Sequence, residues 1–235
     1  MLLKPVALDI YQLTNLIEPM CFSTTASFAS FSVLTIVGVA GLKHVKKPSQ
    51  LFFATIPFLF ATQQLIEGFV WIGILNNTSW KTIPIHLFIF FAQVVWAIWV
   101  PYSILKMEKR PKRIRIMKAC LWVGIFLAVY ISYCLLFYTT TAFITTLHVN
   151  YKLYYPHTYY PILGLFYLIP IILPPLASSV REIRLIGILL FVSFIITKLL
   201  FEDEVISVWC FFAALISSIV FWVLKNHAQQ KTSIQ

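Results

Sequence analysis

The chain has 235 residues, of which 60% are hydrophobic and only 11% are charged, and its mean hydropathy is +0.87. Soluble domains carry about 25% charged residues, so this composition excludes a water-soluble protein. The 18 Lys and Arg exceed the 8 Asp and Glu and give a net charge of +10, which in a membrane protein concerns orientation in the bilayer and indicates no nucleic-acid partner.

The first 20 residues are predicted to form an amphipathic helix on the outer surface of the membrane. Apolar residues recur every three or four positions from Leu2 to Ile17, and Asp9 and Glu18 lie on the opposite face. The segment has a single Lys and lacks the apolar core of a secretory signal. Pro19 is expected to end this helix before the first membrane span.

Seven stretches are apolar over the roughly 20 residues that a helix needs to cross about 30 Å of hydrocarbon. The predicted spans are residues 22–42, 51–75, 83–105, 116–138, 159–177, 183–201 and 205–224. The fifth contains four prolines, which membrane helices tolerate when neighbouring groups satisfy the freed carbonyls. We therefore predict an all-α bundle of seven transmembrane helices over residues 21–225, followed by a short tail at 226–235.

The basic residues predict how the bundle lies in the membrane. Fourteen of the 18 Lys and Arg fall in alternate loops and the tail, and seven of these are in segment 106–118. Because cytoplasmic loops collect Lys and Arg, this pattern puts the amino terminus outside and the carboxyl terminus in the cytoplasm, with about +12 on the inner side and about −2 on the outer side. Besides the lipid bilayer, the expected partners are anionic lipid head groups at segment 106–118, attracted by about 1 kcal/mol per basic residue.

The second span carries a carboxylic acid at membrane depth, Glu67. Gln63, Glu67 and Trp71 are spaced by four residues, and Gln64 precedes Glu67 by three, so the four share one helical face. An ionisable group in hydrocarbon is costly and usually faces the bundle interior, where it marks a functional site. We therefore expect this face to point inward.

Three other spans place polar or small residues in their outer halves, and with Glu67 they predict a polar cavity that opens outward. His86, Gln93 and Trp96 share one face of the third span by their spacing. The candidate ligand-binding residues are Glu67, Gln63, Gln64, Trp71, His86, Gln93, Cys21, Ser23, Ser207 and Cys210. Helix packing is the alternative for the serines, because small residues line helix contacts in membranes.

Cysteine and histidine spacings give weaker signals. Cys21 and Cys210 both fall near the outer boundary, where an oxidising compartment makes them candidates for a disulfide. His148 and His157 lie in the loop after the fourth span, and with His86 and Glu67 they would supply a zinc site of three nitrogens and one oxygen. No CxxC or HxxxH spacing supports a metal site, and the sequence identifies no cofactor.

Three segments carry a family resemblance: MCFSTTASF at 20–28, QQLIEGFVW at 63–71 and SVWCFFAA at 207–214. They resemble an uncharacterised family of bacterial multi-pass membrane proteins whose members begin near MCFSATASF. The resemblance runs from about residue 20 to 224 and implies residence in the bacterial inner membrane, with no assigned activity. Because family members start at the Met-Cys pair, residues 1–19 are either an added surface helix or the result of an upstream start codon.

Three functions stay open on the sequence alone. The favoured one is a carrier or sensor that binds a small molecule, a proton or a cation at Glu67, although no clear inverted repeat supports a transporter. The second is a zinc-dependent intramembrane hydrolase, in which the metal activates a water. The third is a structural or partner-binding membrane subunit. The ligand itself is not identified.

Overall fold

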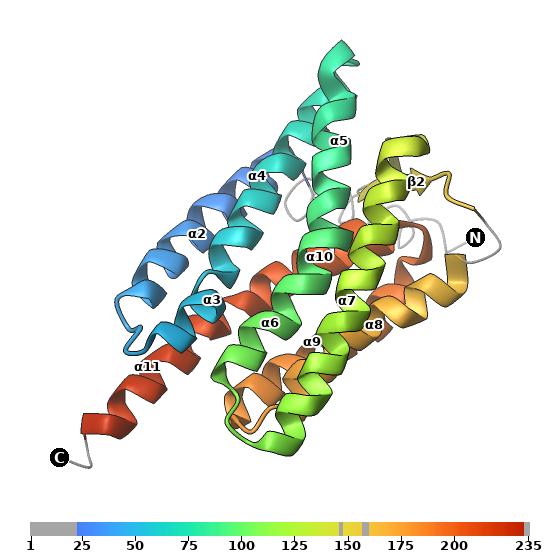
Figure 1. Cartoon of the computed structure of the whole chain (residues 1–235). Helices are drawn as coiled ribbons and strands as arrows, with labels where there is room; N and C mark the ends of the chain where they lie inside the picture. The colour runs from blue at the N-terminus through green and yellow to red at the C-terminus, as the bar shows by residue number, and fades with distance from the viewer. Residues whose placement is uncertain (1–22, 146–147, 157–159, 233–235) are drawn as a thin grey trace, which may run out of the picture.

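The computed structural model describes residues 23–145, 148–156 and 160–232 (Figure 1). The predicted surface helix over residues 1–20 and two of the singled-out residues, Cys21 and His157, lie outside this part of the chain.

Helices make up nearly all of the described chain, as the apolar periodicity predicts. Within the residues that the structure describes, six helical runs are long and apolar enough to cross a membrane. The fifth predicted span coincides with a helix whose apolar part, Leu163–Ala177, is shorter. The principal helices are α2 (Thr24–Leu42), α3 (Leu51–Ala54), α4 (Ile56–Leu75), α5 (Thr82–Ile89), α6 (Trp96–Met107), α7 (Pro111–Phe137), α8 (Tyr160–Ala177), α9 (Arg181–Leu200), α10 (Val205–Ser217) and α11 (Ile219–Thr232).

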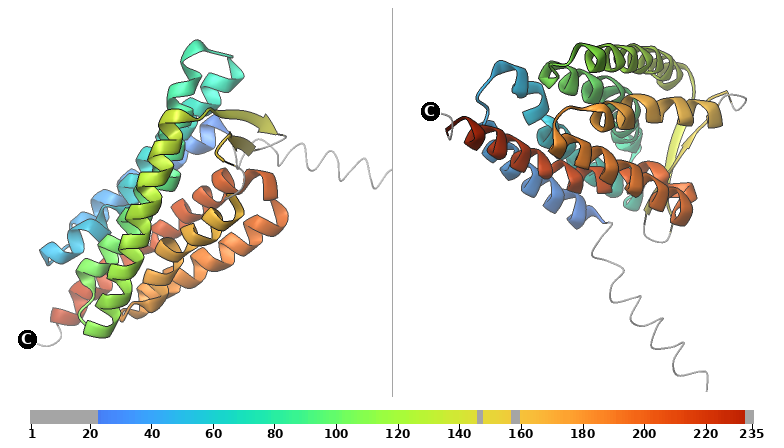
Figure 2. Two further views of the ribbon diagram at one scale, coloured as in Figure 1. Left: turned by 45° about the vertical axis from the view of Figure 1, so that its right-hand side comes forward. Right: turned by 90° about the horizontal axis from the view of Figure 1, so that it is seen from below.

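The helices form a bundle in which α10 lies between two groups. Helix α2 packs along α4, and α6, α7, α8 and α9 pack in sequence order on the other side of the bundle (Figures 1 and 2). The connections α2–α3, α6–α7 and α8–α9 lie at the same end of the bundle as the carboxyl terminus (Figure 1). These connections and the helix ends that adjoin them carry most of the basic residues, so the predicted charge asymmetry corresponds to one physical end of the molecule.

The all-α prediction is wrong at the connection between α7 and α8, which contains a β-hairpin. Strands β1 (Thr140–Thr145) and β2 (His148–Leu153) pair antiparallel, with Ala142 opposite Tyr151. The β-branched and aromatic residues of this segment favour strands, and β2 is buried at five of its six positions. The hairpin lies at the end of the bundle opposite the basic turns (Figures 1 and 2).

The third predicted span is one helical run, but its middle is a π-helix, η3 (Phe90–Val95). A π turn holds more residues than an α turn and so rotates the following residues about the helix axis. As a result, Trp96 is 4% exposed while His86 is only half-buried. The shared face that regular α-helical spacing predicts for these two residues is interrupted there.

Helix α7 passes unusually close to α6 at Gly124. A Cβ placed at Gly124 would lie 1.9 Å from the carbonyl oxygen of Ala97. Small residues allow such close backbone approach between membrane helices. Gly164 in α8, by contrast, has nothing within 4 Å of the corresponding position.

Candidate functional site

Glu67 lies inside the bundle, as the sequence predicts, and is held by two hydrogen bonds from different elements. Ser207 Oγ of α10 donates to Glu67 Oε1 at 2.6 Å, and Gln64 Nε2 donates to Glu67 Oε2 at 3.0 Å. The side chain is only 4% exposed. The carboxyl group therefore joins α4 to α10, and neither of its hydrogen-bond partners is a cation.

Gln63 connects the same face of α4 to α6. The indole N–H of Trp96 donates to Gln63 Oε1 at 2.6 Å, and the Trp96 ring stacks on Phe60 with centroids 3.9 Å apart. Because an indole N–H can only donate, this bond fixes the orientation of the Gln63 amide. The Gln63 Nε2 group is buried and has no oxygen acceptor among the described residues, and the thiol of Cys210 is the hydrogen-bonding group beside it.

Tyr151 of β2 is the residue of this site that the sequence prediction missed. It is 5% exposed, and its ring stacks on Phe88 of α5 with centroids 4.8 Å apart. Its hydroxyl has no hydrogen-bond partner in the described chain. Burial, and then the neighbouring Glu67, raise the pKa of the Tyr151 phenol well above its usual range. In HVNYKL the apolar residues Val149, Tyr151 and Leu153 alternate with polar ones, and this pattern was the signal that would have placed Tyr151 inward.

The structure brings together part of the predicted set. Gln63, Gln64, Glu67 and Ser207 form one buried cluster, and Cys210 of α10 lies beside Gln63 and close to Glu67. We call these five residues, with Tyr151, the Glu67 cluster. Besides the Tyr151 hydroxyl, Gln64 Oε1 is also buried without a partner in the described part.

Other predicted site residues lie elsewhere. Trp71 is buried in the apolar packing around α5 and α7. His86 Nδ1 is 2.9 Å from the carbonyl oxygen of Thr82 in its own helix, and Gln93 is half-buried in η3.

Ser23 caps α2, its Oγ accepting from the N–H of Ala26 at 3.2 Å. Cys21 is outside the described residues, so its pairing with Cys210 stays a prediction.

The proposed zinc ligands do not form a metal site within the described residues. There, no group of three or more His, Cys, Asp and Glu side chains is placed to hold a metal ion. His148 lies near Glu204 and packs edge-on against Phe201, with ring centroids 4.9 Å apart, at the connection from α9 to α10. The hydrolase alternative therefore gains no support from the positions of Glu67, His86 and His148.

The β-hairpin is fastened to the rest of the bundle at its tip. Thr145 Oγ1 donates to Glu204 Oε1 at 2.7 Å. Burial lowers the pKa of His148 below its ordinary value, and the nearby Glu204 carboxylate opposes this shift only in part. The same strand that meets Glu204 through His148 thus reaches Glu67 through Tyr151.

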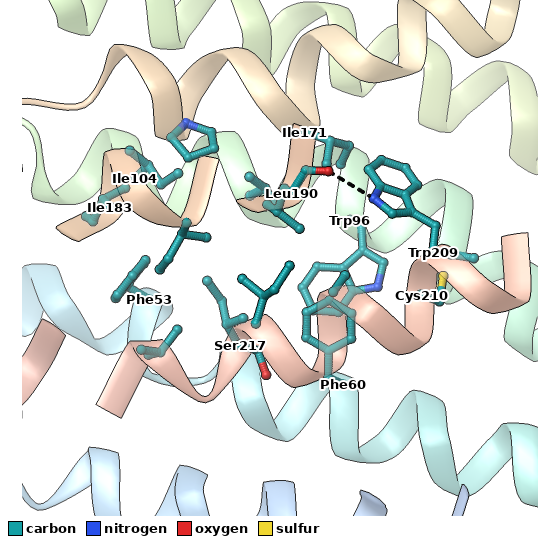
Figure 3. Close-up of a pocket in the computed structure, with 18 of the residues that line it drawn as sticks. Phe53, Phe60, Trp96, Ile104, Ile171, Ile183, Leu190, Trp209, Cys210 and Ser217 are labelled. Carbon is teal, nitrogen blue, oxygen red and sulfur yellow. Dashed lines mark hydrogen bonds between the residues drawn. The ribbon is translucent and has the colours of Figure 1, made fainter. Parts of the chain in front are cut away.

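A pocket of about 70 Å³ adjoins the cluster and continues toward the basic end of the bundle (Figure 3). Trp96, Trp209 and Cys210 lie at one end, and Ile104, Ile183 and Phe53 lie at the other (Figure 3). Its wall is almost entirely apolar and does not include Glu67. This pocket is therefore different in lining and direction from the outward-opening polar cavity that the sequence predicts.

Comparison with known proteins gives a family but no function. The family of unknown function DUF6629 matches the chain over residues 20–234. Neither a curated protein nor a solved structure matches it. The matched residues include all three motif segments and every residue of the Glu67 cluster.

Proposed function

Because the chain belongs to DUF6629, a family without a known function, we propose its role from geometry: an integral membrane protein whose Glu67 cluster binds a small polar molecule, a proton or a cation. The observation that supports this proposal most directly is the buried Glu67 carboxyl group. It has no cationic hydrogen-bond partner, and polar atoms without partners lie around it. Such a group inside a membrane bundle is characteristic of functional sites.

The energetic argument concerns the polar atoms left without partners. A buried donor or acceptor without a hydrogen bond costs about 1–3 kcal/mol. Gln64 Oε1 and the Tyr151 hydroxyl are two such atoms in the described part of the cluster, and Gln63 Nε2 has only the weak thiol acceptor of Cys210 beside it. An occupant that offers both donors and acceptors removes this cost on binding, so the cluster favours a small polar ligand or a hydrated ion over an empty state.

The proposed setting is a bacterial inner membrane that the chain crosses seven times, with α8 as the fifth span. The amino terminus is outside, and the basic end of the bundle faces the cytoplasm. The grouping of the basic connections at one end supports this orientation (Figure 1). In this arrangement the Glu67 cluster lies beneath the outer hairpin, because Tyr151 of β2 is close to Glu67.

The test is ligand-dependent thermal unfolding of the purified protein in lipid nanodiscs. Wild type, Glu67→Gln and Glu108→Gln are compared over a panel of Na⁺, K⁺, Mg²⁺, small ammonium compounds and small carboxylic acids. A ligand at 100 times its Kd stabilises the folded state by about 2.7 kcal/mol. We expect at least one class of compound to stabilise wild type and Glu108→Gln, because Glu108 lies at the basic end of the bundle, away from the cluster. The same compound should not stabilise Glu67→Gln.

A second comparison tests the alternative that the protein is a structural subunit. Glu67→Gln keeps the size of the side chain and can still accept from Ser207, so it is expected to fold. If Glu67→Gln and wild type respond identically to every compound, and cells carrying the variant grow normally at equal protein abundance, the binding function is refuted. A purely structural role for the cluster is then the better account.

A further inference from the structure

The apolar pocket ends beside a turn at which two arginines converge, and we propose that together they bind an anionic phospholipid from the surrounding bilayer. One acyl chain fills the pocket, and the phosphate lies against Arg113 and Arg184. Cys210 is the one residue that the pocket wall shares with the Glu67 cluster, and the occupant proposed here differs from the ligand proposed there.

The wall of the pocket offers nothing polar to an occupant apart from the thiol of Cys210. Four other side chains in the wall carry an N–H or O–H group, and each donates to a protein oxygen. The bonds run from Trp96 to Gln63, from Tyr167 to the Ala92 carbonyl, from Trp209 to the Leu190 carbonyl and from Ser217 to the Ala214 carbonyl. A cavity without polar partners stays free of water and takes up apolar molecules. The occupant in contact with this wall is therefore hydrocarbon.

The length and depth of the pocket match one leaflet. Trp96 and Ile104 line its two ends, and eight helical residues span about 12 Å. One leaflet contributes half of the roughly 30 Å hydrocarbon thickness, which is about 15 Å. Ile104 lies three residues before the end of α6, and Ile183 lies two residues after the start of α9. The pocket thus occupies the half of the bundle next to the basic end, within reach of a chain that enters from that surface.

The head-group site is built on the turn between α8 and α9. A guanidinium N–H of Arg113 donates to the carbonyl oxygen of Ala177 at 3.1 Å, and one of Arg184 donates to that of Ser178 at 3.4 Å. Two positive side chains are thus fixed at consecutive carbonyls. Within the described residues no carboxylate pairs with either of them, because the nearby Glu108 accepts from backbone N–H groups instead.

These arginines have the chemistry that recognises a phosphate. A guanidinium carries five N–H donors, and the bonds to Ala177 and Ser178 each use one of them. Paired, forked N–H groups bind phosphate oxygens more strongly than neutral donors do. A shared anion also relieves the repulsion between two like charges. An anionic head group therefore completes the site, whereas a zwitterionic one brings its own cation next to the arginines.

The two parts of the site are continuous in the chain. Pro175 and Ile183 line the pocket, and they flank the turn that contains Ala177 and Ser178. Arg184 directly follows Ile183. A lipid whose phosphate contacts the arginines consequently has its chain at the mouth of the pocket.

Native mass spectrometry of the detergent-solubilised protein tests the head group. The protein is exchanged into micelles that contain phosphatidylglycerol or phosphatidylcholine, and the retained lipid is measured. We expect retention of phosphatidylglycerol to fall at least tenfold in Arg113→Gln/Arg184→Gln. The control Lys112→Gln/Arg115→Gln removes the same charge from exposed positions at the start of α7 and is expected to change retention less than twofold. Equal losses in both pairs would show general attraction to the basic end and overturn the proposal.

A second variant tests the pocket. Ala213→Phe places a ring into it from α10 and is expected to reduce retention of phosphatidylglycerol at least fivefold, whereas the control Leu215→Phe adds a ring on the exposed side of α10 and leaves retention unchanged. Full retention in Ala213→Phe would show that the acyl chain lies elsewhere and would overturn the proposal. If the double Gln variant does not fold, Arg113→Lys/Arg184→Lys keeps both charges but loses the forked geometry. We expect a threefold loss from it, and unchanged retention would refute the head-group site.

Discussion

Glu108 Oε2 accepts a hydrogen bond from the backbone N–H of Ser179 at 2.7 Å, which joins the α6–α7 turn to the α8–α9 turn. Its other oxygen accepts from the N–H groups of Lys109 and Arg110 at 2.9 and 3.0 Å. One carboxylate therefore holds two helical hairpins together at the basic end of the bundle. Burial acts to raise the pKa of Glu108, but these backbone N–H groups outweigh it, so the pKa lies below its usual value.

Glu108→Ala is expected to lower the free energy of unfolding by about 1–2 kcal/mol, since it leaves three backbone donors without this acceptor. The measurement is thermal unfolding in nanodiscs. Because the pKa of Glu108 is depressed in the folded state, its stabilising effect is full above the ordinary value of 4.5 and is lost as the pH falls below it. Glu108→Gln should therefore flatten the acid limb of the stability curve, and an unchanged limb would contradict this prediction.

Gly124→Ala and Gly164→Ala form a matched pair in neighbouring helices. The added methyl at position 124 meets the backbone oxygen of Ala97 at 1.9 Å, which cannot move without shifting α6. We expect this variant to lose at least 2 kcal/mol of stability, as overpacked cores do. Gly164→Ala has free space and should be neutral or stabilising by up to about 1 kcal/mol. Similar melting temperatures for the two variants would show that α6 and α7 are not in this close contact.

Tyr151→Phe separates the binding role of the hydroxyl from any structural role. The group is buried without a partner in the described chain, so its removal deletes a cost and keeps the ring stacked on Phe88. We expect unchanged or slightly higher thermal stability together with a weaker response to any compound that stabilises wild type through Glu67. A clear loss of stability with no effect on ligand response would assign the hydroxyl a structural role instead.

His148 makes the hairpin sensitive to acid. Its folded-state pKa lies below the ordinary 6.5, so the unfolded chain binds a proton more readily than the folded one. Stability is therefore full above pH 6.5 and declines as the pH falls below it. His148→Gln should reduce this decline, and Glu204→Gln should increase it, because it removes the charge that favours protonated His148. Unfolding curves between pH 5 and 8 measure both effects, and a shift in the same direction for both variants would contradict the assignment.

Single-cysteine labelling tests the orientation of the bundle. In a background without the native cysteines, Lys152→Cys in β2 and Lys112→Cys in α7 place thiols at exposed positions near opposite ends. With a membrane-impermeant maleimide, intact cells should label position 152, and position 112 should react only after permeabilisation. The reverse pattern would invert the proposed topology.

Helical periodicity and membrane depth were sufficient to predict which face of α4 is buried. The spacing of Gln63, Gln64 and Glu67 on one face correctly placed them inside, and Ser207 was correctly assigned to the same region. Those predictions rest on the high cost of polar groups in hydrocarbon, which applies whatever the neighbouring helices are. The same reasoning located six of the seven predicted spans as helical runs of sufficient length.

The rest depends on features that residue type does not specify. No sequence pattern predicts the π turn at Phe90–Val95. This turn rotates Trp96 about the helix axis, so that Trp96 and His86 no longer share one face. Tyr151 was not singled out, because its segment was predicted as a loop after the fourth span and the packing of β2 into the bundle depends on tertiary contacts. Segment 106–118 was taken as a loop, although it is helical from Pro111, since a proline is well suited to the first turn of a helix.

The hydrogen bond between Ser207 and Glu67 also sets an order for biogenesis. The two residues are 140 positions apart, and at about 5–20 residues per second the second is synthesised roughly 7 to 28 seconds after the first. During that interval α4 lies in the membrane, and the Glu67 carboxyl group has only the hydrogen bond from Gln64 of its own helix. Completion of the cluster therefore waits for the last spans, and a nascent chain arrested before α10 exposes an unfinished polar face to the machinery that inserts or degrades membrane proteins.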